Sequence, residues 1–200
     1  YPDATTTSQA YDAFGNTLSS TDQKGNTNSY AYDASERVTA ETNALGNAVS
    51  YTYDADGNLL TYTDENGNTT SYTYDVLGRL INESTPLGKT TSYTYDAAGN
   101  RLSLTDPNGN TINYTYDALG RLTTVSYPDS TQVSYTYDAL GRRISMTDST
   151  GTTNYSYDDL SRLTSVDGPL SDDTISYTYD EVGNRASMSM PGGTIVTYNY

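Results

Sequence analysis

The chain has 200 residues, a formal net charge of −15 at pH 7 and a pI near 4.1. This negative charge argues against nucleic acid or an anionic membrane surface as a partner. Histidine and cysteine are absent, which removes the usual ligands of zinc, haem and iron–sulfur clusters, the thiol nucleophile and the commonest general base. We therefore expect no cofactor and no enzymatic activity. No apolar run approaches the ~20 residues of a membrane helix, so no membrane insertion is expected.

Tyrosine is the unusual component of the chain. Leu, Ile, Val and Phe make up only roughly 15% of the residues, a share typical of disordered chains. The 22 tyrosines argue against disorder, because disordered segments are poor in aromatic residues. Their regular placement argues against it more strongly.

A repeat that begins with a Tyr-Asp pair runs along the whole chain. It starts with YDAFGN at 11–16, and SYTYD or NYTYD returns at 71, 92, 113 and 134. The interval between successive aspartates is 21 residues, except for one interval of 20 followed by one of 22. These aspartates are Asp12, Asp33, Asp54, Asp75, Asp96, Asp117, Asp138, Asp158 and Asp180. A fixed period of this length indicates units that stack on their neighbours.

Each repeat contains two turn signals. A Gly usually stands three residues after the Asp of the Tyr-Asp pair, with Glu36 and Ser161 as the exceptions, and Arg or Asn follows. About halfway along, TDQKGNT, TDENGNT and TDPNGNT carry the same Asp-x-x-Gly spacing. Asp can bond backbone N–H groups two or three residues on, and Gly adopts the left-handed conformation that closes a type I hairpin turn. We predict a hairpin turn every 10 or 11 residues.

Two kinds of strand are expected between the turns. In the first, tyrosines two apart, such as Tyr72 and Tyr74, share one face, and Thr73 lies on the other. The second carries aliphatic residues two apart. These pairs are Leu102 with Leu104, Ile144 with Met146 and Ala186 with Met188. The alternation indicates a sheet with one apolar face.

Two architectures fit this pattern. In a hairpin meander each repeat supplies two antiparallel strands and advances ~9.6 Å, whereas in a β-helix it forms one coil and advances ~4.8 Å. Paired turns favour the meander, and the β-helix remains the alternative. We predict an all-β fold, a repetitive antiparallel β-hairpin sheet with two strands per 21-residue repeat. A sheet of ~19 strands should curl into a spiral, tube or solenoid, with its tyrosine face covered.

The residues expected to carry the structure recur at equivalent positions of the central repeats. They are Tyr72, Tyr74, Asp75, Gly78, Tyr93, Tyr95, Asp96, Gly99, Tyr114, Tyr116, Asp117, Gly120, Tyr135, Tyr137, Asp138 and Gly141. We interpret the tyrosines as core or stacking residues rather than a carbohydrate-binding or redox surface. Replacing Tyr116 by Ala should then destabilise the fold by about 2–4 kcal/mol. The recurring Arg79, Arg121, Arg142 and Arg162 are expected to stack on tyrosines or pair with turn aspartates of adjacent repeats.

No metal site is predicted, but two turns resemble the start of a calcium loop. Their candidate ligands are Asp54, Asp56, Asp64 and Asn66. A complete EF-hand needs a later bidentate Glu and flanking helices, and neither is present. The carboxylates occur once or twice per repeat and no single pair stands out for acid–base catalysis. Turn capping explains the same residues.

These motifs resemble the YD-repeat or Rhs-repeat family; YTYDALGRL at 114–122 matches its motif closely, and the resemblance covers the whole chain. In that family long β-sheets spiral into hollow shells. The shells of bacterial Rhs proteins and Tc toxins enclose a toxic C-terminal domain, and a similar shell in teneurins serves cell adhesion. The resemblance implies a secreted, extracellular or cell-surface protein. The four letters Asp-Pro-Asn-Gly at 106–109 match the core of the Rhs autoprotease segment, but the surrounding pattern is missing.

The chain as a whole is interpreted as structural. We expect residues 1–200 to form a single array of about nine YD repeats, a segment of a longer chain without a capping or effector domain. Its uniform repeats suit an open-ended filament or surface appendage, and part of a shell around a C-terminal toxin is the alternative. The expected partners are further YD repeats of the same chain or identical copies, or an enclosed toxin domain.

Overall fold

The computed structural model describes residues 6–200, and every statement about the structure refers to these residues. They form one 19-stranded antiparallel sheet and one short 3-10 turn, η1, at Pro191–Gly193. The strands are β1 Ser8–Tyr11, β2 Thr17–Thr21, β3 Thr27–Tyr32, β4 Val38–Thr42, β5 Ala48–Tyr53, β6 Leu59–Thr63, β7 Thr69–Tyr74, β8 Leu80–Ser84, β9 Thr90–Tyr95, β10 Arg101–Thr105, β11 Thr111–Tyr116, β12 Leu122–Ser126, β13 Gln132–Tyr137, β14 Arg143–Asp148, β15 Gly151–Tyr157, β16 Leu163–Asp167, β17 Ile175–Tyr179, β18 Arg185–Ser189 and β19 Ile195–Thr197. The all-β prediction is confirmed.

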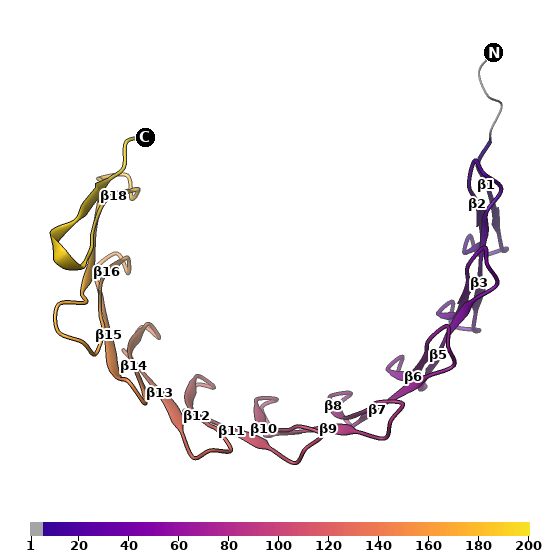
Figure 1. The fold of residues 1–200 in the computed structure, drawn as a ribbon, viewed down its shortest axis with the longest axis horizontal. Helices are drawn as coiled ribbons and strands as arrows, with labels where there is room; N and C mark the ends of the chain where they lie inside the picture. Colours follow the sequence, from indigo (N-terminus) through magenta and orange to yellow (C-terminus); the bar gives the residue numbers. More distant parts are fainter. Residues whose placement is uncertain (1–5) are drawn as a thin grey trace. The chain divides into compact units, whose positions relative to one another are not determined.

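Strands that follow one another in sequence are neighbours in the sheet. β5 pairs antiparallel with β6, β6 with β7, and β7 with β8, and the same order holds from β10 to β19. The ribbon can be followed strand by strand in Figure 1. A β-helix would pair each strand with its equivalent one coil away, so antiparallel pairing confirms the hairpin meander and excludes the β-helix alternative for the described residues.

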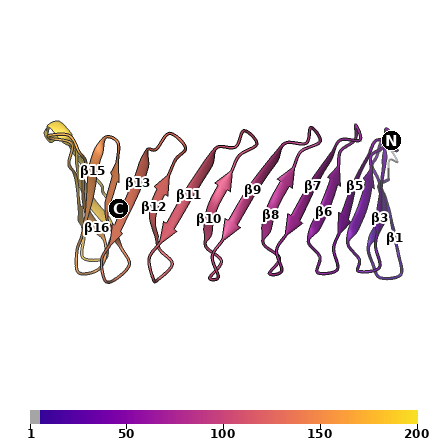
Figure 2. The same cartoon turned by 90° about the horizontal axis from the view of Figure 1, so that it is seen from below.

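The sheet divides into two compact units, residues 1–93 and 94–200. In each unit the hairpins stand side by side, with turns at both ends of the strands (Figure 2). One edge of each unit carries the turns that begin at the Asp of a Tyr-Asp pair, which we name YD turns. The opposite edge carries the turns halfway along each repeat, which we name mid-repeat turns.

Both kinds of turn close in the same way. In one YD turn the N–H of Asp117 donates to the carbonyl of Arg121 at 2.9 Å, and the N–H of Gly120 donates to the carbonyl of Asp117 at 3.0 Å. Gly120 has a φ of 75°, in the left-handed region. Glu36 and Ser161, at the two positions that lack Gly, adopt φ values of 62° and 63°. The predicted hairpin turns are therefore present, and their geometry holds even without Gly.

The capping bonds of the turn aspartates differ from the expectation in one respect. Asp117 Oδ1 accepts hydrogen bonds from the N–H groups of Leu119 and Arg121, two and four residues on, at 2.9 and 3.0 Å. The N–H three residues on belongs to Gly120 and already bonds the backbone carbonyl of Asp117. The carboxylate therefore bonds the N–H groups on either side of Gly120, and the N–H of Gly120 itself closes the turn through the backbone.

A β-bulge accompanies the YD hairpins, which sequence alternation did not predict. In the β13–β14 pair, Thr136 faces Ser145 and Tyr137 faces Arg143, so Ile144 has no direct partner. Ile144 is 39% exposed, and Leu102, at the same position of another repeat, is 40% exposed. The expected pairing of these residues with Met146 and Leu104 on one apolar face is therefore wrong, because the bulge shifts the alternation by one residue.

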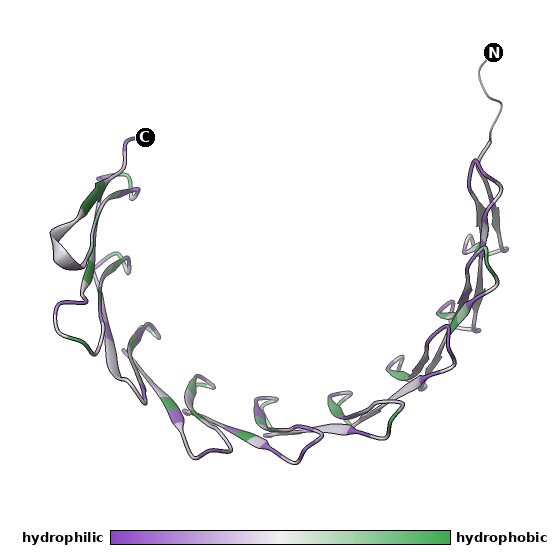
Figure 3. Ribbon diagram, in the orientation of Figure 1, coloured by the Kyte–Doolittle hydropathy of each residue, from purple (hydrophilic) through white to green (hydrophobic). Residues whose placement is uncertain are grey.

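The two faces of the sheet differ in chemistry. One carries the half-buried tyrosines, and the other carries Ser and Thr hydroxyls that bond across neighbouring strands. These pairs include Thr52–Thr61, Thr63–Thr69, Ser84–Thr90, Thr94–Ser103, Thr105–Thr111, Thr136–Ser145 and Thr178–Ser187. Among the described residues only Val125, 7% exposed, counts as buried core. Hydrophobic residues recur along the hairpins instead of gathering in one interior (Figure 3).

Candidate functional site

The second tyrosine of a Tyr-Asp strand ties its repeat to the preceding one. Tyr137 Oη donates a 2.8 Å hydrogen bond to the backbone carbonyl of Leu122, the first strand residue after the preceding YD turn. The same bond joins Tyr32 to Thr17, Tyr53 to Val38, Tyr74 to Leu59, Tyr116 to Arg101, Tyr157 to Arg143 and Tyr179 to Leu163. Each ring thus packs on the sheet while its hydroxyl is satisfied.

An arginine after the YD turn reaches forward to the next repeat. Arg121 Nε donates to Asp117 Oδ2 at 2.7 Å, while its Nη1 donates to the backbone carbonyl of Asp138 at 3.1 Å. The guanidinium carbon lies 4.8 Å from the ring centroid of Tyr137, within the range of a cation–π contact. Arg37, Arg142 and Arg162 repeat this arrangement. We name this contact set the arginine joint.

The arginine joint confirms the expected stacking on tyrosine but corrects the expected ion pair. The carboxylate that Arg121 contacts, at 2.6 Å from Nη2, is Asp117 of its own turn and not an aspartate of an adjacent repeat. Asp138, in the next repeat, directs its carboxylate to the N–H groups of its own turn. The guanidinium of Arg121 therefore bonds the backbone carbonyl of Asp138 instead of its carboxylate.

Asparagine replaces the arginine in alternate repeats of the first half. Asn100 Nδ2 donates to Asp96 Oδ2 at 2.9 Å, so the turn is capped, but the amide is too short to make the forward contacts of arginine. Asn16, Asn58 and Asn184 cap their turns in the same way. We name this contact set the asparagine joint.

Grooves lie at two of the asparagine joints. One groove, of about 580 Å³, is lined by Asp96, Ala98, Asn100, Asp117, Ala118, Leu119 and Gly120. The other, of about 390 Å³, is lined by Asp56, Asn58, Val76, Leu77 and Gly78. The glycine of the next YD turn has a near neighbour in both joints: a Cβ on Gly141 would lie 3.8 Å from Arg121 Nη1, and a Cβ on Gly120 would lie 3.6 Å from Asn100 Oδ1. Both side chains thus reach the next YD turn, and the arginine also donates to its backbone.

A second group of arginines, one residue further on, was missed by the sequence analysis. The guanidinium carbon of Arg143 lies 4.5 Å from the ring centroid of Tyr155, and that of Arg101 lies 4.8 Å from the centroid of Tyr114. Arg185 stacks on Tyr177 at 4.7 Å. The bulge places these arginines opposite the second tyrosine of a hairpin, as Arg143 stands opposite Tyr137. The rings on which they stack belong to first tyrosines. Tyrosine rings therefore stack mainly on guanidinium groups; Tyr51 and Tyr62 make a ring–ring contact.

The predicted repeat residues occupy equivalent places in successive hairpins. The first tyrosines, Tyr72, Tyr93, Tyr114 and Tyr135, and the second tyrosines, Tyr74, Tyr95, Tyr116 and Tyr137, are all half-buried. Asp75, Asp96, Asp117 and Asp138 begin YD turns, and Gly78, Gly99, Gly120 and Gly141 close them with positive φ. Partial burial raises the pKa of Tyr74 and Tyr116.

The calcium candidates serve the turns that contain them. Asp54 Oδ1 accepts the N–H groups of Asp56 and Asn58, and Asp64 Oδ1 accepts those of Asn66 and Asn68. The side-chain amide of Asn58 lowers the pKa of Asp54, helped by backbone N–H groups and opposed by partial desolvation. Across residues 6–200 no cluster of three or more His, Cys, Asp or Glu side chains is placed to hold a metal ion.

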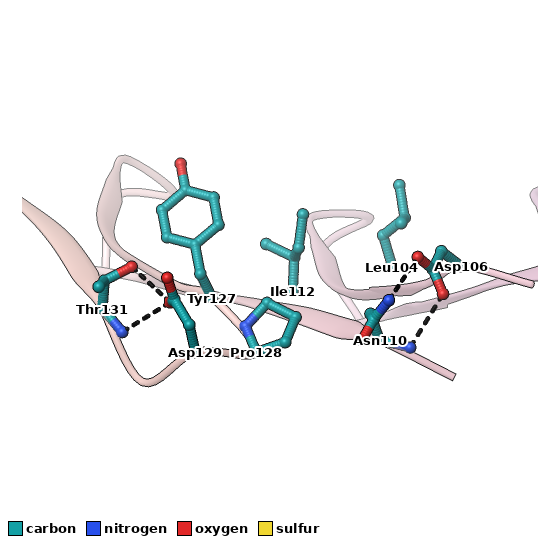
Figure 4. Close-up of a pocket in the computed structure, with 8 residues that line it drawn as sticks. All are labelled: Leu104, Asp106, Asn110, Ile112, Tyr127, Pro128, Asp129 and Thr131. Carbon is teal, nitrogen blue, oxygen red and sulfur yellow. Dashed lines mark hydrogen bonds between the residues drawn. The ribbon is translucent and has the colours of Figure 1, made fainter. Parts of the chain in front are cut away.

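A third groove lies on the mid-repeat edge of the second unit, with a volume of about 520 Å³. It runs between the mid-repeat turns at 106–109 and 127–130 and is lined by Leu104, Asp106, Asn110, Ile112, Tyr127, Pro128, Asp129 and Thr131. Leu104, Ile112 and Tyr127 project to the same side (Figure 4). We name it the tyrosine groove. The Asp-Pro-Asn-Gly segment at 106–109 is an ordinary mid-repeat turn beside it.

The first unit has a groove at the equivalent place, 63 residues or three repeats earlier. It measures about 230 Å³, and its lining includes Glu41, Asn43, Asn47, Val49 and Glu65. Glu41 stands where the tyrosine groove has Leu104, and Glu65 stands where it has Pro128. The two grooves therefore occupy equivalent places, and Leu104 and Pro128 of one lining are replaced by Glu41 and Glu65 in the other.

Family models match nearly the whole chain. The teneurin YD-shell model matches residues 8–153, and the RHS repeat model matches residues 137–172 and 157–195. The chain belongs to the teneurin YD-shell family. No curated protein matches the sequence. The structure contains no helix, among residues 6–200, that is long and apolar enough to cross a membrane.

Several solved structures share this fold. The crystal structure of TcdB2-TccC3-TEV matches with a TM-score of 0.73 at 21% identity, over 100% of this chain and 12% of that chain. The crystal structure of TcdB2-TccC3 without its hypervariable C-terminal region matches with a TM-score of 0.60 at 19% identity, over 98% and 16%. The Tc holotoxin pore of Photorhabdus luminescens matches with a TM-score of 0.57 at 22% identity, over 99% and 14%. This YD-shell chain spans about a seventh of these relatives.

Proposed function

We propose that this chain is a non-catalytic stretch of wall in a hollow extracellular shell. The observation that carries the proposal is the joint, because tyrosine hydroxyls and arginines tie each hairpin to the next at equivalent positions along both units. Stability that is spread over neighbour contacts suits a thin, extended sheet. A single layer with one hydroxyl face and one tyrosine–arginine face suits a wall rather than a compact domain.

The shell is proposed to enclose a toxic C-terminal domain. The likeness to TcdB2-TccC3 assemblies supports this cargo, because the matched structures hold the same repeat fold over the whole length of this chain. The other partners are further YD repeats of the same polypeptide, which would continue the sheet on either side. Secretion or surface exposure follows from the same proposal.

The second candidate is an open-ended filament or surface appendage. The uniformity of the array favours it, because the same turn bonds recur in YD and mid-repeat turns with lengths between 2.8 and 3.3 Å. Closure of a shell would require repeats that depart from this pattern, whereas propagation would not.

Cryo-electron microscopy of the full-length native protein tests both candidates. Discrete hollow particles with density inside are expected for a toxin shell. Long fibres with an axial repeat near ~4.8 or ~9.6 Å would overturn the shell and support the filament. Hollow particles without internal density would support the proposal of a shell wall but contradict the proposal of an enclosed toxin.

A further inference from the structure

The tyrosine groove lies beside a mid-repeat turn that lacks both the first-position Asp and the closing Gly. Tyr127 stands at the first position, where Asp106 and Asp64 cap their turns, and Asp129 supplies the bond to the N–H of Thr131 instead. Ser130 stands where Gly109 closes the preceding turn, and it adopts a φ of 70°. A tyrosine cannot cap a turn as an aspartate does, so its presence at this position points to another role for the ring.

The floor of the groove is apolar and open. Tyr127 is 38% exposed, whereas Leu104 and Ile112 are half-buried and pair directly across β10 and β11. The three side chains project to the same side, with the ring of Pro128 next to them (Figure 4). This surface offers contact to an alkyl chain and the face of one aromatic ring.

Two carboxylates flank the floor. Asp129 Oδ1 accepts the N–H and hydroxyl of Thr131 at 2.9 and 2.6 Å, while its Oδ2 accepts no hydrogen bond from any described residue. Asp106 Oδ2 accepts only the side-chain amide of Asn110. The side chains of Thr131 and Asn110 lower the pKa of Asp129 and Asp106 respectively, so both are charged at neutral pH. The lining contains no Lys or Arg.

The chain itself displays the chemistry that such a surface recognises. In its arginine joints a guanidinium lies over a tyrosine ring while donating to an aspartate, as Arg121 does with Tyr137 and Asp117. The tyrosine groove offers the same two groups, ring and carboxylate, with an apolar floor for the methylene stem. We propose that the tyrosine groove binds an arginine side chain presented by an exposed segment of a partner protein.

Saturation-transfer difference NMR on the full-length protein tests this binding, with the peptide acetyl-Gly-Arg-Gly-amide as the probe. The arginine methylene protons should receive the strongest saturation, because the stem lies on Leu104 and Ile112. Asp129→Asn should weaken binding by about threefold to tenfold, and Tyr127→Ser by a similar factor. Tyr127→Phe should bind like the unchanged protein, because the ring face is kept.

Two controls separate this site from general attraction to an acidic chain. Glu65→Gln alters the groove of the first unit, whose lining includes Tyr30 but has Glu41 where the tyrosine groove has the apolar Leu104, and should leave the affinity unchanged. The citrulline analogue of the peptide has nearly the same shape without the charge and should bind at least threefold more weakly. Equal affinity for Asp129→Asn, Tyr127→Ser and the unchanged protein, all with native circular dichroism, would overturn the proposal. Equal binding of the citrulline peptide would overturn its charge requirement.

Discussion

The arginine joint at Arg121 and the asparagine joint at Asn100 are neighbours built on the same backbone. Both residues follow a YD turn and both bond the aspartate that begins it. Only Arg121 continues to the next repeat, through the carbonyl of Asp138 and the ring of Tyr137. A groove lies beside Asn100.

The difference separates two tasks that a repeat residue performs. Capping its own turn requires a donor close to the backbone, and both side chains supply one. Joining repeats requires a longer reach, which only arginine has. At the asparagine joint Tyr116 donates to the carbonyl of Arg101, and the guanidinium of Arg101 donates to the hydroxyl of Tyr114. The two joints should therefore respond alike when the shared contacts are removed and differently when the forward contacts are removed.

Acid should have the largest effect, because it removes the contact that both joints share. The pKa values of Asp96 and Asp117 are lowered, that of Asp96 chiefly by the amide of Asn100 and that of Asp117 chiefly by the backbone N–H of Arg121. A lowered pKa means that stability is fully present above the unfolded value near 3.8 and is lost as the pH falls through the lower folded values. Urea unfolding followed by circular dichroism should show a constant midpoint from pH 7 to 5 and a fall below about pH 4. A fall between pH 7 and 5 would contradict this assignment.

Removing a second tyrosine should come next. Tyr116→Ala is expected to cost toward the lower end of about 2–4 kcal/mol, because the ring is half-buried. Tyr137→Ala should cost about 0.5–1 kcal/mol more, because Arg121 also loses its aromatic platform. Urea unfolding of both variants measures the difference. Equal losses would show that the guanidinium gains nothing from the ring.

Exchanging the joint residues tests the forward contact directly. Arg121→Asn should destabilise the array by about 1 kcal/mol, because it removes one hydrogen bond to a carbonyl and one cation–π contact. Asn100→Arg should stabilise it by a similar or smaller amount, since the new side chain also loses rotamer freedom. Thermal and urea unfolding of the two variants and of the double exchange provide the measurement. An Asn100→Arg variant no more stable than the original would show that the groove does not accept the guanidinium.

The smallest effect is expected from Tyr→Phe changes. Tyr137→Phe and Tyr116→Phe each remove one hydrogen bond to a carbonyl and should cost about 0.5–1 kcal/mol. The two losses should be equal, because the bond is the same in both joints, at 2.8 and 2.9 Å. A markedly larger loss at Tyr116 would mean that the asparagine joint depends more on this bond than the arginine joint does.

Much of the fold follows from sequence, because its causes are local. The Asp-x-x-Gly spacing determines the turns, and the alternation of Tyr and Thr determines the faces of the first strands. The bulge could not be predicted, because it depends on cross-strand pairing that leaves Ile144 without a partner. Without the bulge, the stacking of Arg143 on Tyr155 could not be foreseen either. A recurring Arg beside the bulge was the available signal.

The candidate grooves were also beyond sequence reasoning. The tyrosine groove depends on which mid-repeat turns become neighbours, and thus on the meander. The sequence nevertheless marks the position of the tyrosine groove, since Tyr-Pro-Asp-Ser at 127–130 breaks the Asp-x-x-Gly pattern. The groove beside Asn100 lies between two successive YD turns, so it too depends on which turns become neighbours.

The two irregular repeats show where the array tolerates a change of length. The interval of 20 residues falls where the mid-repeat turn is shortened, with Asp148 pairing directly with Gly151, and the interval of 22 falls where the connection from Asp167 to Ile175 is longer. Across these turns the Tyr157 and Tyr179 bonds span 14 and 16 residues instead of 15, yet both keep their lengths of 2.9 and 2.8 Å.

Insertions and deletions should therefore be tolerated better at the mid-repeat edge of this protein than at the YD edge. An insertion or deletion in a mid-repeat turn leaves the strands and their joints in place, whereas one in a YD turn would displace the capping Asp and the Arg or Asn that follows it. Related arrays should accumulate length variation, inserted loops and new epitopes along the mid-repeat edge. The number of residues in each YD turn should stay constant.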